Sequence, residues 1–140
     1  MQDLTTFITH HPFLNLAAAT VLALVMLVEL IRAKRNIFNI TPPQAIRLIN
    51  RDNAIVLDIR PNDAYRNGHI IDAQSVVPQE IRQSLKKLEK FKGRPIIIVS
   101  NASNESQKIA ALLLKHGYNA YSITGGMRAW SEAQMPLVKE

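Results

Sequence analysis

The sequence contains no cysteine among its 140 residues. This absence excludes disulfides, thiolate zinc sites, iron–sulfur clusters and any reaction through a thiol of this chain. It leaves the cellular compartment open, because cysteine-free proteins occur in both reducing and oxidising environments. The neighbouring His10 and His11 are too few ligands for a metal site. We therefore expect neither a bound metal nor another cofactor.

Acidic residues are also scarce, since 11 of them face 17 lysines and arginines, giving a formal net charge of +6. Such a balance favours nucleic acid or an anionic membrane surface as a partner. Aromatic residues make up only 6% of the chain and do not cluster with the basic ones, as they do in many nucleic-acid-binding proteins. We therefore expect no nucleic-acid partner and favour a membrane.

One long hydrophobic run is present near the N-terminus. Residues 13–31 include only three strongly polar members, Asn15, Thr20 and Glu29. A helix of that length is about 28 Å long, close to the hydrocarbon thickness of a bilayer. Glu29 lies one turn before Arg32 and can pair with it. The run predicts a transmembrane helix over 13–31, which makes the lipid bilayer the first expected partner.

Two other interpretations of this run fit less well. A cleaved signal peptide needs a positively charged beginning and a cleavage pattern of small residues, but residues 1–12 carry Asp3 and two histidines, and no such pattern follows. A buried helix of a soluble domain is apolar on one face, whereas residues 14–28 are apolar on nearly every face.

The basic residues predict the orientation of this helix. All 17 lysines and arginines follow it, beginning with Arg32, Lys34 and Arg35. By the positive-inside rule, residues 1–12 form a short extracytoplasmic N-terminus, 32–37 a basic linker and 38–140 a cytoplasmic domain. The chain is thus expected to cross the membrane once.

The domain after the linker alternates between strand and helix patterns. Short extended or strand-like segments are expected at 36–40, 54–57, 75–77, 96–99 and 119–123, with helices between them. One of these helices carries Ile81, Leu85 and Leu88 at the spacing of a single helical face. This alternation predicts an α/β fold with a mostly parallel sheet and helices on both faces.

A small polar loop is the main candidate for a site. It follows the strand at 96–99 and precedes a helix expected at 105–116. A strand that ends in a tight loop at a helix N-terminus presents free N–H groups to an anion. The anion-binding candidates are therefore Ser100, Asn101, Ala102, Ser103, Asn104, Glu105 and Ser106.

Short motifs over about residues 38–137 resemble, in order and spacing, a single-domain rhodanese-like protein. They are Asp58-Ile59-Arg60, Gly68-His69-Ile70-Ile71-Asp72-Ala73, Gly117-Tyr118-Asn119-Ala120-Tyr121, Gly125-Gly126-Met127-x-x-Trp130 and Met135-Pro136-Leu137. With the preceding span, the chain resembles the membrane-anchored rhodanese-like proteins of proteobacteria. The resemblance implies a five-stranded rhodanese-like fold and a location in the bacterial inner membrane.

The resemblance also implies that the loop is changed. The family's enzymes carry a persulfide on a cysteine at the end of the fourth strand, which corresponds to Ser100 here. The usual glycine of the loop corresponds to Ser103, and the usual arginine to Glu105. A serine without a base is a poor nucleophile and cannot hold sulfane sulfur, while Glu105 repels anions. We interpret the loop as unable to transfer sulfur.

The roles of several polar residues remain open between chemistry and structure. Ser100 is a nucleophile with His69 or His116 as its base, or a remnant hydroxyl bonded within the loop. Asp58 and Arg60 support a substrate or form an internal ion pair. His69 is a ligand or a structural hydrogen-bonding group. For each of these we favour the structural interpretation.

The stretch 82–94 is strongly basic. Its candidates for contact with anionic headgroups are Arg82, Lys86, Lys87 and Lys90. The alternative is a solvated helix face beside the apolar stripe, which is the common role of such charge runs.

Three hypotheses about function follow. The favoured one is a catalytically inactive, membrane-tethered module that binds another membrane or cytosolic protein at the cytoplasmic face. The second is an enzyme that keeps sulfur-transfer or phosphatase-like chemistry by an unusual route. The third is a protein that binds a small anion in the loop 100–106 without turnover.

Overall fold

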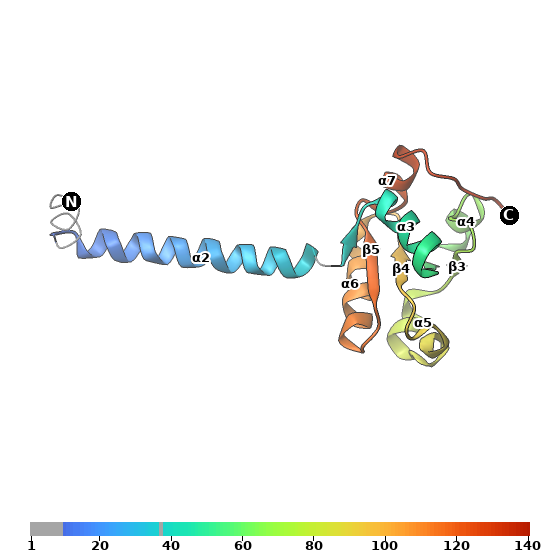
Figure 1. The fold of residues 1–140 in the computed structure, drawn as a ribbon, viewed down its shortest axis with the longest axis horizontal. Helices are drawn as coiled ribbons and strands as arrows, with labels where there is room; N and C mark the ends of the chain where they lie inside the picture. Colours follow the sequence, from blue (N-terminus) through green and yellow to red (C-terminus); the bar gives the residue numbers. More distant parts are fainter. Residues whose placement is uncertain (1–9, 37) are drawn as a thin grey trace. The chain divides into compact units, whose positions relative to one another are not determined.

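The computed structural model describes residues 10–36 and 38–140, which divide into two units at residue 37 (Figure 1). Most of the predicted extracytoplasmic segment, residues 1–9, lies outside the described part, as does Ile37 of the predicted linker.

The first unit is the helix α2, Pro12–Asn36. The segment from Pro12 to Ala33 is long and apolar enough to cross a membrane, by length and composition alone. Thr20 Oγ1 donates to the carbonyl oxygen of Leu16 at 2.8 Å, so its hydroxyl is satisfied within the helix. Glu29 and Arg32 pair at 3.3 Å. The predicted run 13–31 lies inside α2, and the residues expected as a linker remain helical as far as Asn36.

The second unit is built on a five-stranded sheet in the order β1-β5-β4-β2-β3. Its strands are β1 (Asn39–Ile40), β2 (Ile55–Asp58), β3 (Gln74–Ser75), β4 (Ile96–Val99) and β5 (Ala120–Ile123). All four neighbouring pairs are parallel, which confirms the predicted sheet. The four apolar residues of β4 lie in the middle and are completely buried.

Helices cover both faces of the sheet. They are α3 (Pro42–Asp52), α4 (Asn62–Arg66), α5 (Pro78–Gln83), the 3₁₀ helix η1 (Lys86–Phe91), α6 (Ser103–Lys115) and α7 (Gly126–Glu132). Side chains alternate along β4: Ile97 and Val99 pack with α3, α4 and α7, whereas Ile96 and Ile98 pack with α5, η1 and α6. The sheet thus separates two hydrophobic cores.

Local sequence explains where two of the helices begin or end. Gln44 Oε1 accepts a hydrogen bond from the backbone N–H of Thr41 at 2.8 Å, and a proline follows at the first helical position of α3. Gly117, with a positive φ of 84°, follows the C-cap of α6.

The single helical face predicted through Ile81, Leu85 and Leu88 is wrong. Ser84 has extended backbone angles (φ −154°, ψ 124°), which end α5 at Gln83. The chain then continues as η1, a 3₁₀ helix from Lys86. Ile81 and Leu88 are nevertheless buried in the same core. The apolar spacing therefore identified the buried side chains but not the break between two short helices.

Candidate functional site

The predicted site residues meet where β2 and β4 end. Asp58 pairs in register with Val99, so the chain after each strand leaves the sheet at the same edge. A cavity of about 270 Å³ opens there, and it is lined by Ile59, Arg60, Pro61, Ser100, Asn101, Ala102, Asn104 and Glu105. Sheet topology therefore brings Arg60 beside the Ser100 loop.

The loop is shorter than predicted. Ala102 has extended backbone angles and is the N-cap of α6, which begins at Ser103. The loop proper is therefore Ser100–Ala102, and the remaining candidates form the first turn of the helix. The prediction of a loop through Ser106 and of a helix that starts only at 105 is corrected accordingly.

Ser100 is held by backbone groups. The residue is 5% exposed, and its Oγ donates to the carbonyl oxygen of Ala102. The carbonyl oxygen of Ser100 accepts the N–H of Met127 at 3.0 Å. A Cβ on Gly126 would lie 2.4 Å from that same oxygen, so only glycine allows α7 to begin so close to the loop.

Neither histidine considered as a base is bonded to Ser100 in the described part of the chain. His69 is buried, donates from Nδ1 to the carbonyl oxygen of Tyr65 at 2.9 Å, and stacks on the Tyr65 ring with centroids 3.9 Å apart. His116 donates from Nδ1 to the carbonyl oxygen of Leu112. These contacts match the structural interpretation of His69 and leave the Ser100 hydroxyl without an activating base.

Asp58 and Arg60 form an internal ion pair. Their side chains are 1% and 7% exposed, and Arg60 Nη2 lies 2.6 Å from Asp58 Oδ2. Arg60 Nε donates to both carboxylate oxygens, and Nη2 also donates to the carbonyl oxygen of Gly68 at 2.7 Å. The positive charge next to the cavity is therefore already neutralised, as the structural interpretation of this pair requires.

Two candidates in the first turn of α6 do not line the cavity. Ser106 is completely buried, bonds Ser122 Oγ at 2.8 Å and donates to the carbonyl oxygen of Ser103 at 3.0 Å. Ser106 thus joins α6 to β5, a structural role that the sequence did not reveal. Ser103 is likewise absent from the cavity lining.

Glu105 does line the cavity, and its carboxylate is half exposed. It lies 3.7 Å from Arg82 of α5, a residue predicted to contact the membrane surface. An anion that entered the cavity would meet the negative charge of Glu105, while Arg82 is engaged by it.

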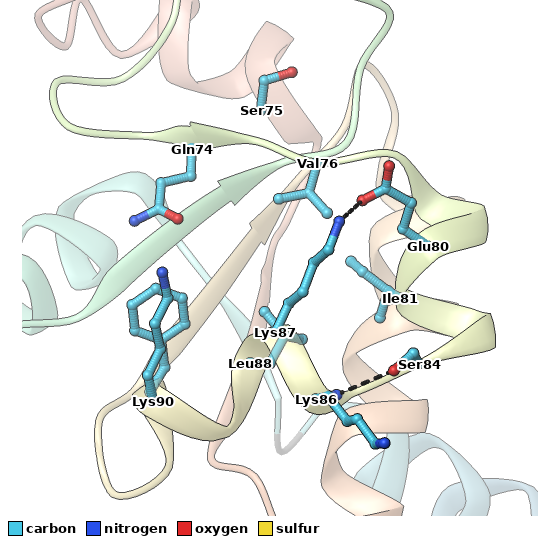
Figure 2. A pocket seen from close by; sticks show the side chains of 11 residues that line it. Gln74, Ser75, Val76, Glu80, Ile81, Ser84, Lys86, Lys87, Leu88 and Lys90 are labelled. Atoms are coloured by element: carbon cyan, nitrogen blue, oxygen red, sulfur yellow. Dashed lines mark hydrogen bonds and ion pairs between the residues drawn. The ribbon is translucent and has the colours of Figure 1, made fainter.

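A second cavity, of about 450 Å³, is bordered by β3, α5 and η1 (Figure 2). Lys86, Lys87 and Lys90, the other predicted surface residues, all line it, and Arg82 does not. Sequence reasoning missed this cavity because β3 and η1 are brought together only by the sheet and its packing. The two cavities share no lining residue.

Within the described residues, no group of three or more His, Asp or Glu side chains is placed to hold a metal ion. The chain has no cysteine to add a ligand.

Comparison with known proteins gives a consistent result. The family described as rhodanese-like domain matches residues 41–133. The uncharacterized protein YibN of Escherichia coli is 32% identical over 141 residues, covering 99% of each chain. The thiosulfate sulfurtransferase GlpE of Pseudoalteromonas translucida is 31% identical over 102 residues, covering 72% of this chain and 95% of its own.

Among solved structures, a rhodanese-related protein from Thermoplasma volcanium superposes with a TM-score of 0.66 at 24% identity. The match covers 73% of this chain and 98% of that protein. A full-length protein from Lactobacillus plantarum gives a TM-score of 0.67 at 18% identity. At these identities the likeness concerns the fold alone.

Proposed function

The chain belongs to the rhodanese-like domain family, and we propose that it is a catalytically inactive member that serves as a membrane-tethered binding module for another protein. In this proposal α2 crosses the bacterial inner membrane once, with the N-terminus outside. The domain from Phe38 onward then works at the cytoplasmic face.

The observation that carries the proposal is the chemistry at Ser100. Ser100 directly follows β4, where the resemblance places the sulfur-carrying cysteine, and the chain contains no cysteine. Its hydroxyl is bonded to the carbonyl oxygen of Ala102 and has no histidine partner among the described residues. A persulfide requires a thiolate sulfur, which a hydroxyl cannot replace.

A small-anion site in the loop is the weaker alternative. It would rely on the few N–H groups of the short segment Ser100–Ala102 and the start of α6. Glu105 places a negative charge on the cavity wall, and Arg60 is already paired with Asp58. Both features reduce the attraction of the cavity for an anion.

The test of inactivity is a thiosulfate:cyanide sulfurtransferase assay on the full chain in detergent. We expect no turnover above that of Ser100→Ala, which serves as the matched control for contaminating enzymes. Turnover by the natural chain that disappears in Ser100→Ala would overturn the proposal, because it would make the Ser100 hydroxyl essential to a reaction.

The absence of cysteine makes the membrane topology directly testable. Single-cysteine variants Thr5→Cys and Glu140→Cys can be treated in intact cells with a maleimide that does not cross membranes. We expect Thr5→Cys to react in intact cells and Glu140→Cys only after lysis. The reverse pattern, or reaction of both without lysis, would contradict the proposed orientation.

Photo-crosslinking in intact cells tests the binding role. Ile71 and Val77 are large apolar side chains of the domain that are about half exposed. A photoreactive residue at one of these positions is expected to give a discrete protein adduct that the exposed control position Lys139 does not give. A failure of all surface positions of the domain to form adducts would contradict a protein-binding role.

A further inference from the structure

The 3₁₀ geometry of η1 sorts its side chains into three rows. Such a helix has about three residues per turn, so residues i and i+3 project from the same side. The apolar row is buried in the core between the sheet and the helices α5, η1 and α6. The rows of η1 are Leu88 with Phe91, Lys87 with Lys90, and Lys86 with Glu89.

The three lysines of η1 line a cavity of a size suited to a small ligand. Its volume of about 450 Å³ lies within the range of about 300–1,000 Å³ that is common for ligand pockets. Apolar side chains form part of its wall, namely Val76, Ile81, Leu88 and Phe91. Its charged groups are three lysines and Glu80, an excess of two positive charges (3 − 1).

Figure 2 shows two of these lysines reaching across the cavity toward β3 and α5. Lys90 extends toward the side-chain amide of Gln74, and its Nζ lies 4.8 Å from the centre of the Phe91 ring. A cation over an aromatic face is attracted to it, so this ammonium group has a defined place at the wall. Lys86 extends in another direction, away from Gln74 and Glu80.

The positive charge of the cavity is available to a ligand. Lys87 Nζ lies 2.9 Å from Glu80 Oε2, but the two side chains are 77% and 49% exposed, and such surface pairs are weak. Among the ion pairs of the described residues, Lys86 and Lys90 have no carboxylate partner. An anion can therefore bind Lys90 directly. It can also bind Lys87 at a small cost in free energy, because the exposed pair with Glu80 is weak.

We propose that this cavity binds a phosphate group through the ammonium groups of Lys87 and Lys90 and the side-chain amide of Gln74. A phosphate offers three oxygens to donors that approach from different sides, and lysine binds it as a point charge. The apolar wall then contacts the group that the phosphate carries. The source is a lipid headgroup or a soluble phosphate ester.

This inference goes beyond the proposed function and does not depend on it. The lysine cavity shares no residue with the Ser100 cavity, so sulfurtransferase activity could be found without affecting phosphate binding. Failure of one proposal is therefore distinguishable from failure of the other.

The test is a nuclear magnetic resonance titration of the full chain in a zwitterionic detergent, with inorganic phosphate and then glycerol 3-phosphate as probes. The backbone amide signals of Gln74, Ser75, Lys87 and Lys90 are expected to shift and saturate together. Chloride at the same ionic strength is the control for general salt effects. Shifts equal to those in chloride would overturn the proposal.

Substitutions separate a site from diffuse positive charge. Lys90→Gln is expected to weaken phosphate binding about fivefold or more, since a charged hydrogen bond is lost. Lys92→Gln is the matched control: Lys92 also lies over an aromatic ring, that of Tyr118 at 5.6 Å, but it does not line the cavity. It removes the same charge and should change affinity less than about twofold. Equal losses in the two variants would contradict a localised site.

Gln74→Met tests the third donor without changing net charge. We expect a loss of about fivefold in phosphate affinity, because the amide hydrogen bond to an ionised phosphate oxygen is lost. An unchanged affinity would remove Gln74 from the proposed site.

Short-chain lipids decide between the two sources. A lipid headgroup is indicated if dihexanoyl phosphatidic acid binds at least about tenfold more tightly than glycerol 3-phosphate, and if Lys90→Gln weakens the binding of both ligands by a similar factor. Equal affinities indicate a soluble phosphate ester. Dihexanoyl phosphatidylcholine is the control, because its choline cation offsets the phosphate charge. If phosphatidylcholine bound as tightly as phosphatidic acid, recognition of the phosphate charge would be contradicted.

Discussion

Glu105 of α6 pairs with Arg82 of α5, with 3.7 Å between Oε1 and Nη2. The carboxylate stands where the resemblance places the usual arginine of the sulfurtransferase loop, and the cation that Glu105 pairs with belongs to another helix. Both side chains are about half exposed, so the pair contributes little stability. Its effect is on the charge at the mouth of the Ser100 cavity.

This relationship predicts how far sulfurtransferase activity can be restored. Ser100→Cys supplies a thiol but leaves the negative Glu105 on the cavity wall, so it should restore little activity. Ser100→Cys with Glu105→Arg should restore more, because a thiosulfate anion then meets positive charge. The measurement is the initial rate of thiosulfate:cyanide sulfur transfer by each variant.

The matched control combines Ser100→Cys with Glu105→Gln, which removes the repulsion without adding a cation. An intermediate rate is expected. Equal rates for Ser100→Cys and the double variant with arginine would mean that Glu105 does not limit anion capture.

Asp58→Asn is expected to destabilise the domain strongly. It leaves the guanidinium of Arg60 buried without its counter-charge, a change that costs about 3–5 kcal/mol. The free energy of unfolding can be measured in urea from the fluorescence of Trp130, the single tryptophan, which is buried. Glu132→Gln, which breaks the exposed Arg128–Glu132 pair, is the control and should cost less than about 0.5 kcal/mol. Similar losses in both would contradict the structural role of the buried pair.

Gly126→Ala tests the close approach of α7 to the Ser100 loop. The new Cβ would lie 2.4 Å from the carbonyl oxygen of Ser100, and φ is +60°, so we expect a loss of about 3 kcal/mol. Gly93→Ala is matched for positive φ (+92°) but meets no atom within 4 Å, and should cost only about 1–2 kcal/mol. A difference near zero between the two variants would mean that the approach is not tight.

Tyr65 should lose its hydroxyl proton at a higher pH than an exposed tyrosine does. Burial first, then the negative charges of Glu140 and Asp58, raise the pKa of Tyr65 above its usual value. Its hydroxyl also donates to the carbonyl oxygen of Ala73 at 2.7 Å. Because the folded state holds this proton more tightly than the unfolded state, the stabilisation is complete below about pH 10 and is lost as pH rises through the raised pKa.

The absorbance of tyrosinate against pH measures this titration. Tyr65→Phe should remove a component that titrates above about pH 10, whereas Tyr121→Phe should leave that component in place. If the component lost in Tyr65→Phe titrated at or below about pH 10, the predicted direction would be wrong.

Much of the architecture was predictable because it depends on local patterns. The apolar run over 13–31, the buried run 96–99 and the glycines at 117 and 125 each act through neighbouring residues. Composition alone also decides the chemistry that is missing, since a chain without cysteine can form no thiolate.

Other features needed the tertiary structure because they join segments that are distant in sequence. Nothing in the local pattern links Glu105 to Arg82, or Ser106 to Ser122, since these contacts depend on how α6 packs against α5 and β5. The extended backbone at Ser84 divides one expected helix into α5 and η1. This division places Lys87 and Lys90 of η1 on the wall of a cavity that β3 also lines. The sequence by itself thus determined the buried segments, the family resemblance and the lost thiol, through composition and periodicity. The arrangement of charge around the two cavities was decided only by the order of the strands and the packing of helices upon them, which bring together side chains that no local pattern connects.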